Sequence, residues 1–452
     1  MTLYYDQLKQ LDHSCLWHPF TQMQDWMAEE PCIISQGDGH YLVDVNGRKY
    51  LDGVSSLWCN VQGHRKKELD DALKAQLDRI AHSTFLGLSH VPGIQLAHKL
   101  IEIAPQGLRR VFYSDSGATA VEIAIKMAVQ YWQLKGDSQR TQIASLVESY
   151  HGDTVGSMSM GYSETFHRYF KSLLFPVLRI TPPHVFRYYQ GMTDADALKA
   201  ALNEAEQKLT ENQTTLAALV MEPLVQGAAG MWTQPVEYVT ALSELCRRKG
   251  IVLIFDEVAT GFGRTGKMFA CEHAGVTPDI LCLAKGITGG YLPLAATLTT
   301  EEIFSAFLGE YKEFKTFFHG HTYTGNPLGC AVAIANLELF ERENIVEKMQ
   351  PGISYIKKRL NDDFLALPHV SDVRQWGFMV GIEVVEEKNP RKNYAPEERI
   401  GHKVILEARK RSVMIRPLGD VIILMPPLSI SKDELRLLLD VTFDSIQAVT
   451  VG

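Results

Sequence analysis

The sequence lacks the features that mark membrane, secreted and nucleic-acid-binding proteins. No apolar run reaches the roughly 18 residues that a helix needs to cross a bilayer. The first residues have neither the basic nor the apolar region of a secretory signal. No block of Lys and Arg occurs, and the formal net charge is −8. We therefore expect a cytoplasmic protein that binds neither nucleic acid nor an anionic membrane.

Cysteine is also sparse. The seven cysteines are scattered, odd in number and never spaced as Cys-x-x-Cys. This distribution argues against a disulfide framework and against a structural zinc site. His319 and His321 resemble a metal-binding pair only faintly, and no third ligand is evident, so we expect no metal centre.

The chain has 452 residues, of which 46% are hydrophobic and 22% charged, enough for two or three domains. Between about residues 108 and 300, short apolar runs alternate with amphipathic stretches. Five runs stand out: 110–114, 143–147, 217–221, 251–255 and 280–283. Runs of about five residues without polar alternation are typical of strands buried on both faces, so we predict an α/β fold with a largely parallel sheet.

The two ends of the chain have a different pattern. The first 50 or so residues predict a helical arm and a small hairpin that turns at Asn46-Gly47. After about residue 342 the pattern indicates a smaller α+β unit, with a helix near 400–411 and short strands near 413–416 and 422–425. We predict an N-terminal segment (1–54) that joins the small domain, a large domain (55–342) and a C-terminal small domain (343–452).

Two familiar glycine motifs overlap in the segment after residue 256, and we reject both. Gly261, Gly263 and Gly266 satisfy G-x-G-x-x-G, but a dinucleotide site also needs an acidic residue roughly 20 positions later. Asp279 follows Gly266 by only 279 − 266 = 13 residues. A P-loop requires Ser or Thr where this chain has Met268.

Asp256 and Lys285 end two successive apolar runs. Either residue alone could be ordinary, Asp256 as a structural carboxylate and Lys285 as a surface lysine. Their separation of 285 − 256 = 29 residues matches a strand–helix–strand unit, which would bring both side chains to one edge of a parallel sheet. A desolvated lysine can form a Schiff base, and a carboxylate can keep a pyridine nitrogen protonated. Together they predict a site for a carbonyl-bearing pyridine cofactor.

The turn at residues 114–119 lies between a predicted strand and a predicted helix. Its sequence, SDSGAT, offers backbone N–H groups and a helix N-terminus to an anion, although an ordinary helix cap has the same composition. Tyr150 and Asp153 follow another predicted strand. There Tyr150 could cover an aromatic ring while Asp153 orients its neighbours.

These residues together resemble the fold-type I, class III aminotransferases. The resemblance rests on IVLIFDEV (251–258), GFGRTG (261–266), PDI (278–280) and AKG (284–286). Nearly the whole chain is similar to the branch of that class that acts in biotin biosynthesis. The branch features are WHPFTQM (17–23), DGVSS (52–56), SYHGDT (149–154) and IRPLG (415–419).

The resemblance implies a large domain with a mainly parallel seven-stranded sheet, a smaller α+β domain, pyridoxal 5'-phosphate as cofactor and a homodimer with shared active sites. It implies catalytic roles for Lys285, Asp256 and Tyr150. The cofactor-binding residues that it implies are Gly117, Ala118, Tyr150, Asp256, Lys285, His321 and Thr322, the last of these acting from the partner subunit. The substrate-binding residues that it implies are Phe20, Leu57, Tyr150, Lys285, Gly320 and Arg416.

The implied reaction is transamination of 8-amino-7-oxononanoate to 7,8-diaminononanoate, with S-adenosylmethionine as amino donor. Arg416 would bind the substrate carboxylate, unless it serves in a structural ion pair. Phe20, Leu57 and His321 stand where familiar members carry Tyr, Trp and Pro. Because these positions adjoin the donor pocket, L-lysine as donor and a broader ω-aminotransferase remain as alternatives. A non-catalytic binder is disfavoured because Lys285 and Asp256 are both present.

Overall fold

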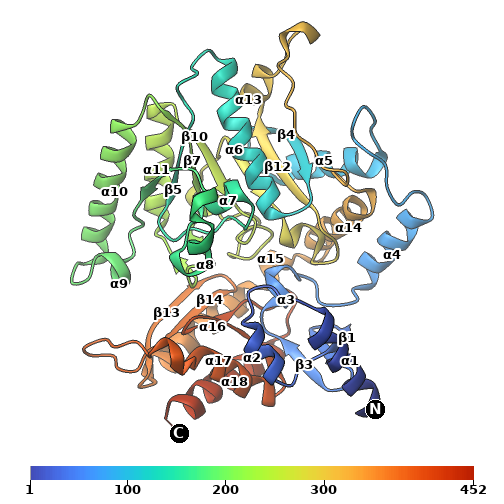
Figure 1. Cartoon of the computed structure of the whole chain (residues 1–452), viewed down its shortest axis with the longest axis vertical. Helices are drawn as coiled ribbons and strands as arrows, with labels where there is room; N and C mark the ends of the chain where they lie inside the picture. The colour runs from blue at the N-terminus through green and yellow to red at the C-terminus, as the bar shows by residue number, and fades with distance from the viewer. Residues whose placement is uncertain (1, 452) are drawn as a thin grey trace.

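The computed structural model describes residues 2–451. Figure 1 shows an upper part built around one large sheet, and a lower part that both ends of the chain enter. No helix among the described residues is long and apolar enough to span a membrane. Within the same residues, no three His, Cys, Asp or Glu side chains converge as a metal site.

The large sheet has seven strands in the order β4-β12-β11-β10-β7-β5-β6. Strand β12 is antiparallel to both of its neighbours, whereas β11, β10, β7, β5 and β6 run parallel to one another. The mainly parallel seven-stranded sheet is therefore confirmed. The strands are β4 (Leu108–Ser114), β5 (Gln142–Leu146), β6 (Val177–Ile180), β7 (Leu216–Met221), β10 (Val252–Asp256), β11 (Ile280–Leu283) and β12 (Ala295–Thr300).

Burial on both faces explains why the central strands are apolar without interruption. Every residue of β7, β10 and β11 is buried. Leu253 and Leu281 point into one apolar cluster, while Ile254 and Ile280 point into a second cluster with α6 (Gly117–Leu134). The period of two residues along a strand thus divides the core into two layers.

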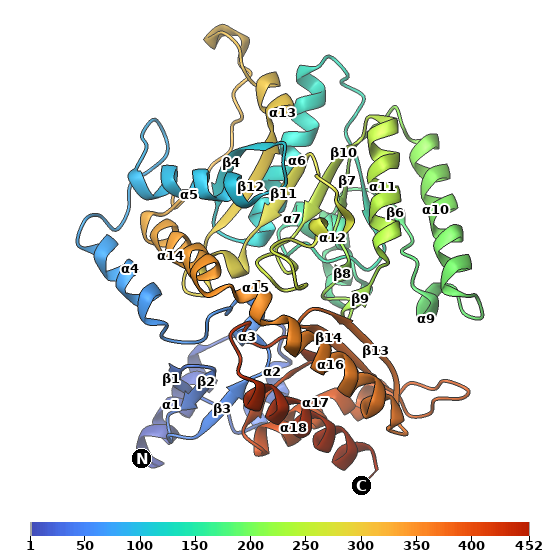
Figure 2. The same ribbon diagram turned by 180° about the vertical axis from the view of Figure 1, so that it is seen from behind.

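Helices flank the sheet on both sides, as Figures 1 and 2 show from opposite directions. Besides α6, the helices of this part are α4 (Lys67–Leu77), α5 (Val91–Ile103), α7 (Val155–Met160), α8 (Glu164–His167), α9 (Val185–Tyr188), α10 (Asp194–Glu211), α11 (Val236–Lys249), α12 (Cys271–Ala274), α13 (Glu301–Ala306) and α14 (Pro327–Glu343). The short α3 (Ser55–Trp58) lies at the top of the lower part. A small hairpin, β8 (Val225–Gln226) and β9 (Trp232–Thr233), follows β7.

The lower part combines the N-terminal and C-terminal segments in one sheet. Its order is β1-β2-β3-β15, and β15 pairs in parallel with β3. This pairing supports the predicted membership of residues 1–54 in the small domain, while the domain boundaries stay predictions. The predicted hairpin turn at Asn46-Gly47 lies between β2 and β3, and Gly47 has φ 83°. These strands are β1 (Ile34–Asp38), β2 (Tyr41–Asp44), β3 (Lys49–Asp52) and β15 (Val413–Met414).

A second four-stranded sheet completes the lower part, in the order β13-β14-β17-β16. Its strands are β13 (Val370–Trp376), β14 (Met379–Val384), β16 (Arg416–Leu418) and β17 (Val421–Leu424). The accompanying helices are α1 (Thr2–Cys15), α2 (Met23–Ala28), α15 (Ile345–Lys348), α16 (Gln350–Asp362), α17 (Ile400–Lys410) and α18 (Lys432–Thr450).

The connection between β10 and β11 differs from the predicted strand–helix–strand unit. It consists mainly of turns, and its one helix, α12, has only four residues. Gly263 (φ 87°) and Gly266 (φ 93°) adopt conformations that a helix excludes. The buried Glu257 carboxylate accepts hydrogen bonds from the N–H groups of Ala270 and Cys271 at 2.6 and 2.8 Å, which ties the loop to the end of β10.

Candidate active site

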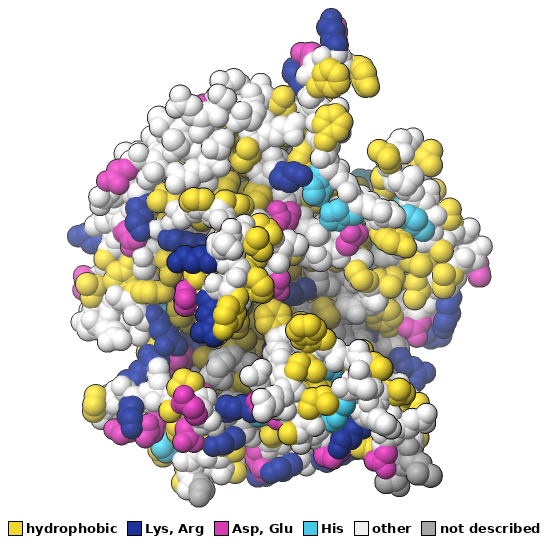
Figure 3. Space-filling view, in the orientation of Figure 1, with side chains coloured by type: hydrophobic (Ala, Val, Ile, Leu, Met, Phe, Trp, Pro, Cys, Tyr) yellow, Lys and Arg dark blue, Asp and Glu magenta, His cyan; other side chains and the backbone are white. Residues whose placement is uncertain are grey.

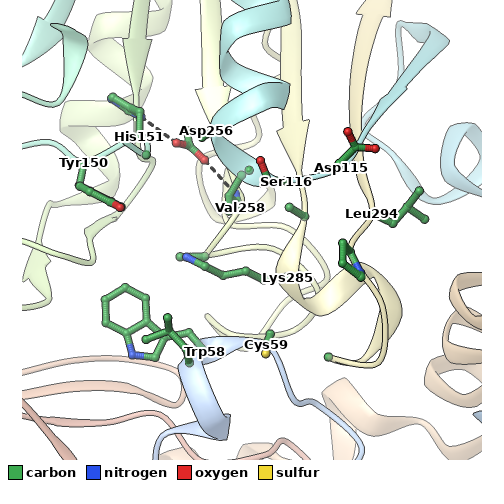
Figure 4. A pocket seen from close by; sticks show the side chains of 18 of the residues that line it. Trp58, Cys59, Asp115, Ser116, Tyr150, His151, Asp256, Val258, Lys285 and Leu294 are labelled. Atoms are coloured by element: carbon green, nitrogen blue, oxygen red, sulfur yellow. Dashed lines mark hydrogen bonds and ion pairs between the residues drawn. The ribbon is translucent and has the colours of Figure 1, made fainter. Parts of the chain in front are cut away.

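A cavity of about 850 Å³ opens where the carboxyl ends of β10 and β11 meet the N-terminus of α6. Open parallel sheets bind ligands at this edge. Six of the predicted site residues line the cavity: Leu57, Gly117, Ala118, Tyr150, Asp256 and Lys285. Figure 4 shows Tyr150, Trp58 and Lys285 around the same space.

Lys285 follows β11 and begins a short 3₁₀ helix, Lys285–Thr288. Its backbone is left-handed, with φ 45°, a conformation that costs energy in a residue with a Cβ. Asn336 of α14 stabilises the turn, because its Nδ2 donates hydrogen bonds to the carbonyls of Gly286 and Ile287 at 2.8 and 3.2 Å. The strained turn holds the lysine side chain inside the cavity instead of continuing the strand.

The Lys285 amine is surrounded by protein. Its Nζ lies 5.0 Å from the centre of the Trp58 ring. Desolvation lowers the pKa of Lys285 below its ordinary value, while the carboxylates of Asp256 and Glu222 oppose that shift. The balance favours an amine that releases its proton more readily than a surface lysine does, as a nucleophile or proton carrier requires.

Asp256 is the last residue of β10, and its side chain is almost fully buried. One carboxylate oxygen, Oδ2, lies 2.7 Å from Nδ1 of the buried His151, and the other accepts the N–H of Val258 at 3.0 Å. Two partners therefore fix the carboxylate in the cavity wall. His151 received no role from the sequence, because its partner lies 105 residues away along the chain.

The predicted phosphate turn forms the N-terminus of α6. Ser116 caps the helix in a reciprocal capping box with Thr119. First-turn N–H groups have no partner inside their own helix, so those of Gly117 and Ala118 are available to an anion. A Cβ on Gly117 would lie 2.5 Å from Cγ1 of Val258, so only glycine fits this turn without displacing a neighbour.

Tyr150 is held at both its backbone and its hydroxyl. Its N–H donates to Oε1 of Glu222 at 3.0 Å, and its hydroxyl donates to Oδ2 of Asp153 at 2.8 Å. Glu222 also accepts the Gly227 N–H, and burial raises its pKa to about 7. Glu222 follows β7 directly, so inspection of every strand end would have found it from the sequence.

The other predicted site residues do not line this cavity in the part of the chain that the structure describes. Phe20 is 61% exposed, and its ring packs edge-on against Phe166. His321 Nδ1 pairs with Oδ2 of Asp115 at 2.7 Å, and Asp115 does line the cavity. Gly320 and Thr322 are exposed in the same segment. Arg416 belongs to β16, where burial lowers its pKa and the nearby Tyr150 opposes the shift.

Comparisons with known proteins agree with this geometry. The family model for aminotransferase class-III matches residues 23–446. The chain belongs to the class III aminotransferases. It is 54% identical over 449 residues to the adenosylmethionine-8-amino-7-oxononanoate aminotransferase of Nitratidesulfovibrio vulgaris, covering 98% of this chain and 82% of that one. It is 48% identical to the protein of the same name from Geobacter sulfurreducens, covering 98% of each chain.

Solved aminotransferase structures share the fold over almost the whole chain. The crystal structure of adenosylmethionine-8-amino-7-oxononanoate aminotransferase from Methanocaldococcus jannaschii is 47% identical, with a TM-score of 0.93 and coverage of 98% of this chain and 99% of that one. An omega transaminase from Pseudomonas jessenii, solved in complex with PMP, is 30% identical with the same TM-score and covers 98% of each chain. This protein is therefore an aminotransferase, an enzyme whose substrates are small molecules.

The Gly117 turn yields the first prediction. In Gly117→Ala the new methyl group must displace Val258, and overlap of this kind costs about 1–3 kcal/mol. We expect the apoenzyme to bind pyridoxal phosphate at least about tenfold more weakly, measured by absorbance titration. The double variant Gly117→Ala/Val258→Ala removes the overlap and should recover most of the affinity. Unchanged affinity in the single variant would show that this turn does not hold the cofactor.

Proposed function

We propose that this aminotransferase uses pyridoxal phosphate to convert 8-amino-7-oxononanoate into 7,8-diaminononanoate in biotin biosynthesis, with S-adenosylmethionine as amino donor. The observation that carries the proposal is the desolvated Lys285 amine, which shares one cavity with the Asp256 carboxylate and the N-terminus of α6. The names of several relatives at 46–54% identity support the substrate and the donor. A cytoplasmic location stays a prediction from the sequence.

The side chains that line the cavity suit pyridoxal phosphate. The α6 N-terminus suits its phosphate, and the glycine at position 117 leaves room for one. Asp256, fixed by His151, suits a protonated pyridine nitrogen. Lys285 supplies the amine that its aldehyde requires. When bound, the cofactor supplies an electron sink for the bond that breaks at the substrate carbon.

The residues of the chain itself then transfer protons and orient the reacting groups. The lowered pKa of Lys285 allows its amine to take a proton from the substrate carbon and later to give that proton up. The Asp256 carboxylate would keep the pyridine nitrogen protonated when the cofactor is bound. The Tyr150 hydroxyl, bonded to Asp153, orients the groups that face Lys285.

Substrate recognition is proposed for residues at the mouth of the site. The Arg416 guanidinium is the cation suited to the substrate carboxylate, because its planar fork matches two carboxylate oxygens. Leu57 lines the cavity beside Trp58, whereas Phe20 lies further out against Phe166. We assign Leu57, Phe20 and Gly320 to the pocket that admits the two substrates in turn.

We further propose a homodimer with shared active sites. An arm at residues 308–318 projects from the upper part, and Figure 3 shows apolar side chains gathered at its tip. Tyr311, Phe314 and Phe318 on the arm are 91%, 66% and 74% exposed. Large exposed apolar groups mark association surfaces. A second copy seated there would bring the exposed Thr322, with His321 beside it, toward the partner's phosphate turn.

Lys285 provides a direct test of the chemistry. Lys285→Ala removes the amine that anchors the cofactor and moves the proton, so turnover should fall by at least about 10³-fold. Steady-state formation of 7,8-diaminononanoate measures the effect. Lys267→Ala, which alters an exposed lysine in the preceding loop, is the matched control and should retain wild-type rates. Comparable activity in both variants would contradict the assignment.

The amino donor is tested by a side-by-side assay. Purified enzyme with 8-amino-7-oxononanoate should form 7,8-diaminononanoate when S-adenosylmethionine is supplied and should form little with L-lysine. Activity with lysine alone would overturn the donor while leaving the reaction intact. Activity with ornithine or 4-aminobutyrate as donor but none on 8-amino-7-oxononanoate would favour a broader ω-aminotransferase.

A further inference from the structure

His167 is a buried histidine beside the active site to which the sequence gave no role. It ends the short helix α8, and only 2% of its surface is exposed. Its Nε2 lies 3.6 Å from Oδ1 of Asp153, the residue whose other oxygen accepts the Tyr150 hydroxyl at 2.8 Å. Tyr150, Asp153 and His167 therefore form a row that leads from the cavity into the protein.

The hydrogen bonds of His167 determine which ring nitrogen carries the proton. Nδ1 accepts the backbone N–H of Ser163 at 3.0 Å. Burial lowers the pKa of His167 below its ordinary value, while Asp153 opposes the shift and Arg179 adds to it. A neutral ring that accepts at Nδ1 must carry its proton on Nε2. The nearest carboxylate oxygen to Nε2 in a salt-bridge contact is Oδ1 of Asp153 at 3.6 Å, and Nε2 makes no hydrogen bond to any of residues 2–451.

Asp153 needs a second restraint to hold Tyr150 in place. Its side chain is about half exposed and could turn into solvent. One oxygen accepts the Tyr150 hydroxyl, and Nε2 of His167 lies 3.6 Å from the other. A shift of a few tenths of an ångström would bring the 3.6 Å separation into hydrogen-bond range.

We propose that His167 is a positioning residue for transamination, and that its Nε2–H holds the Asp153 carboxylate so that Tyr150 presents its hydroxyl to the space occupied by substrate and cofactor. The inference rests on the proposed function, because the reacting groups must lie in this cavity. If His167 were purely structural, its function would be to accept the Ser163 N–H and to pack against the Phe166 ring.

Two substitutions separate these roles. His167→Asn keeps an acceptor where Nδ1 stands and so keeps the Ser163 contact, but it has no donor that reaches Asp153. His167→Gln has its terminal amide where Nε2 stands, so it keeps the donor and loses the Ser163 contact. We expect the Asn variant to react about tenfold more slowly at saturating amino donor, because misplaced groups cost this order of rate. The Gln variant should recover most of the rate.

The rates are measured per cofactor-loaded subunit, from the absorbance change when the amino donor reacts. An Asn variant as fast as wild type, or a Gln variant as slow as the Asn variant, would overturn the proposal. If the Asn variant does not fold, the Gln variant decides alone: a retained rate supports the role, and a tenfold loss contradicts it.

A coupling measurement gives an independent answer. In an Asp153→Asn background, His167→Asn should slow the reaction no further, since His167 acts through that carboxylate. A second tenfold loss of rate would contradict the proposal that His167 acts through Asp153. The donor half-reaction also separates this inference from the proposed function. If the wild-type enzyme reacts with a donor but not with 8-amino-7-oxononanoate, the proposed substrate is wrong. The rates of the His167 variants in the donor half-reaction would still test the role of His167.

Discussion

Desolvation of the Lys285 amine is the constraint on which the rest of the active site depends. A buried ammonium is costly, and the wall around it provides opposing carboxylates at Asp256 and Glu222. Both carboxylates are themselves fixed, Asp256 by His151 and Glu222 by the N–H groups of Tyr150 and Gly227. The arrangement keeps an amine inside the cavity with a pKa below that of an exposed lysine.

The fold supplies this arrangement through the parallel pairing of β10 and β11. Asp256 lies opposite Cys282 in that register, so Lys285 emerges at the same edge a few residues later. The N-terminus of α6 opens onto the same edge and offers its unpaired N–H groups to an anion. Amine, carboxylate and helix N-terminus thus converge from a stretch of sequence that spans 285 − 117 = 168 residues.

Features that depend on burial or on local sequence could be predicted. The run at 217–221 marked a strand because both its faces are buried, and the Asp256 and Lys285 side chains followed from the geometry of parallel strands. β12 was missed among the apolar runs because half of its sequence, AATLTT, is threonine and only one residue is a large apolar one. His151 and His167 were missed because their roles depend on side-chain packing, whereas Glu222 could have been found because it directly follows a predicted strand. The predicted helix between β10 and β11 was wrong except for the four residues of α12, because Gly263 and Gly266 have positive φ.

The central claim is that Lys285 is the amine that holds the cofactor. Borohydride reduction of the purified holoenzyme, followed by proteolysis and mass spectrometry, tests it most directly. We expect one stable adduct with the mass of reduced pyridoxal phosphate, located on the peptide that contains Lys285. An adduct on another lysine, or none in a protein that carries the chromophore, would contradict it.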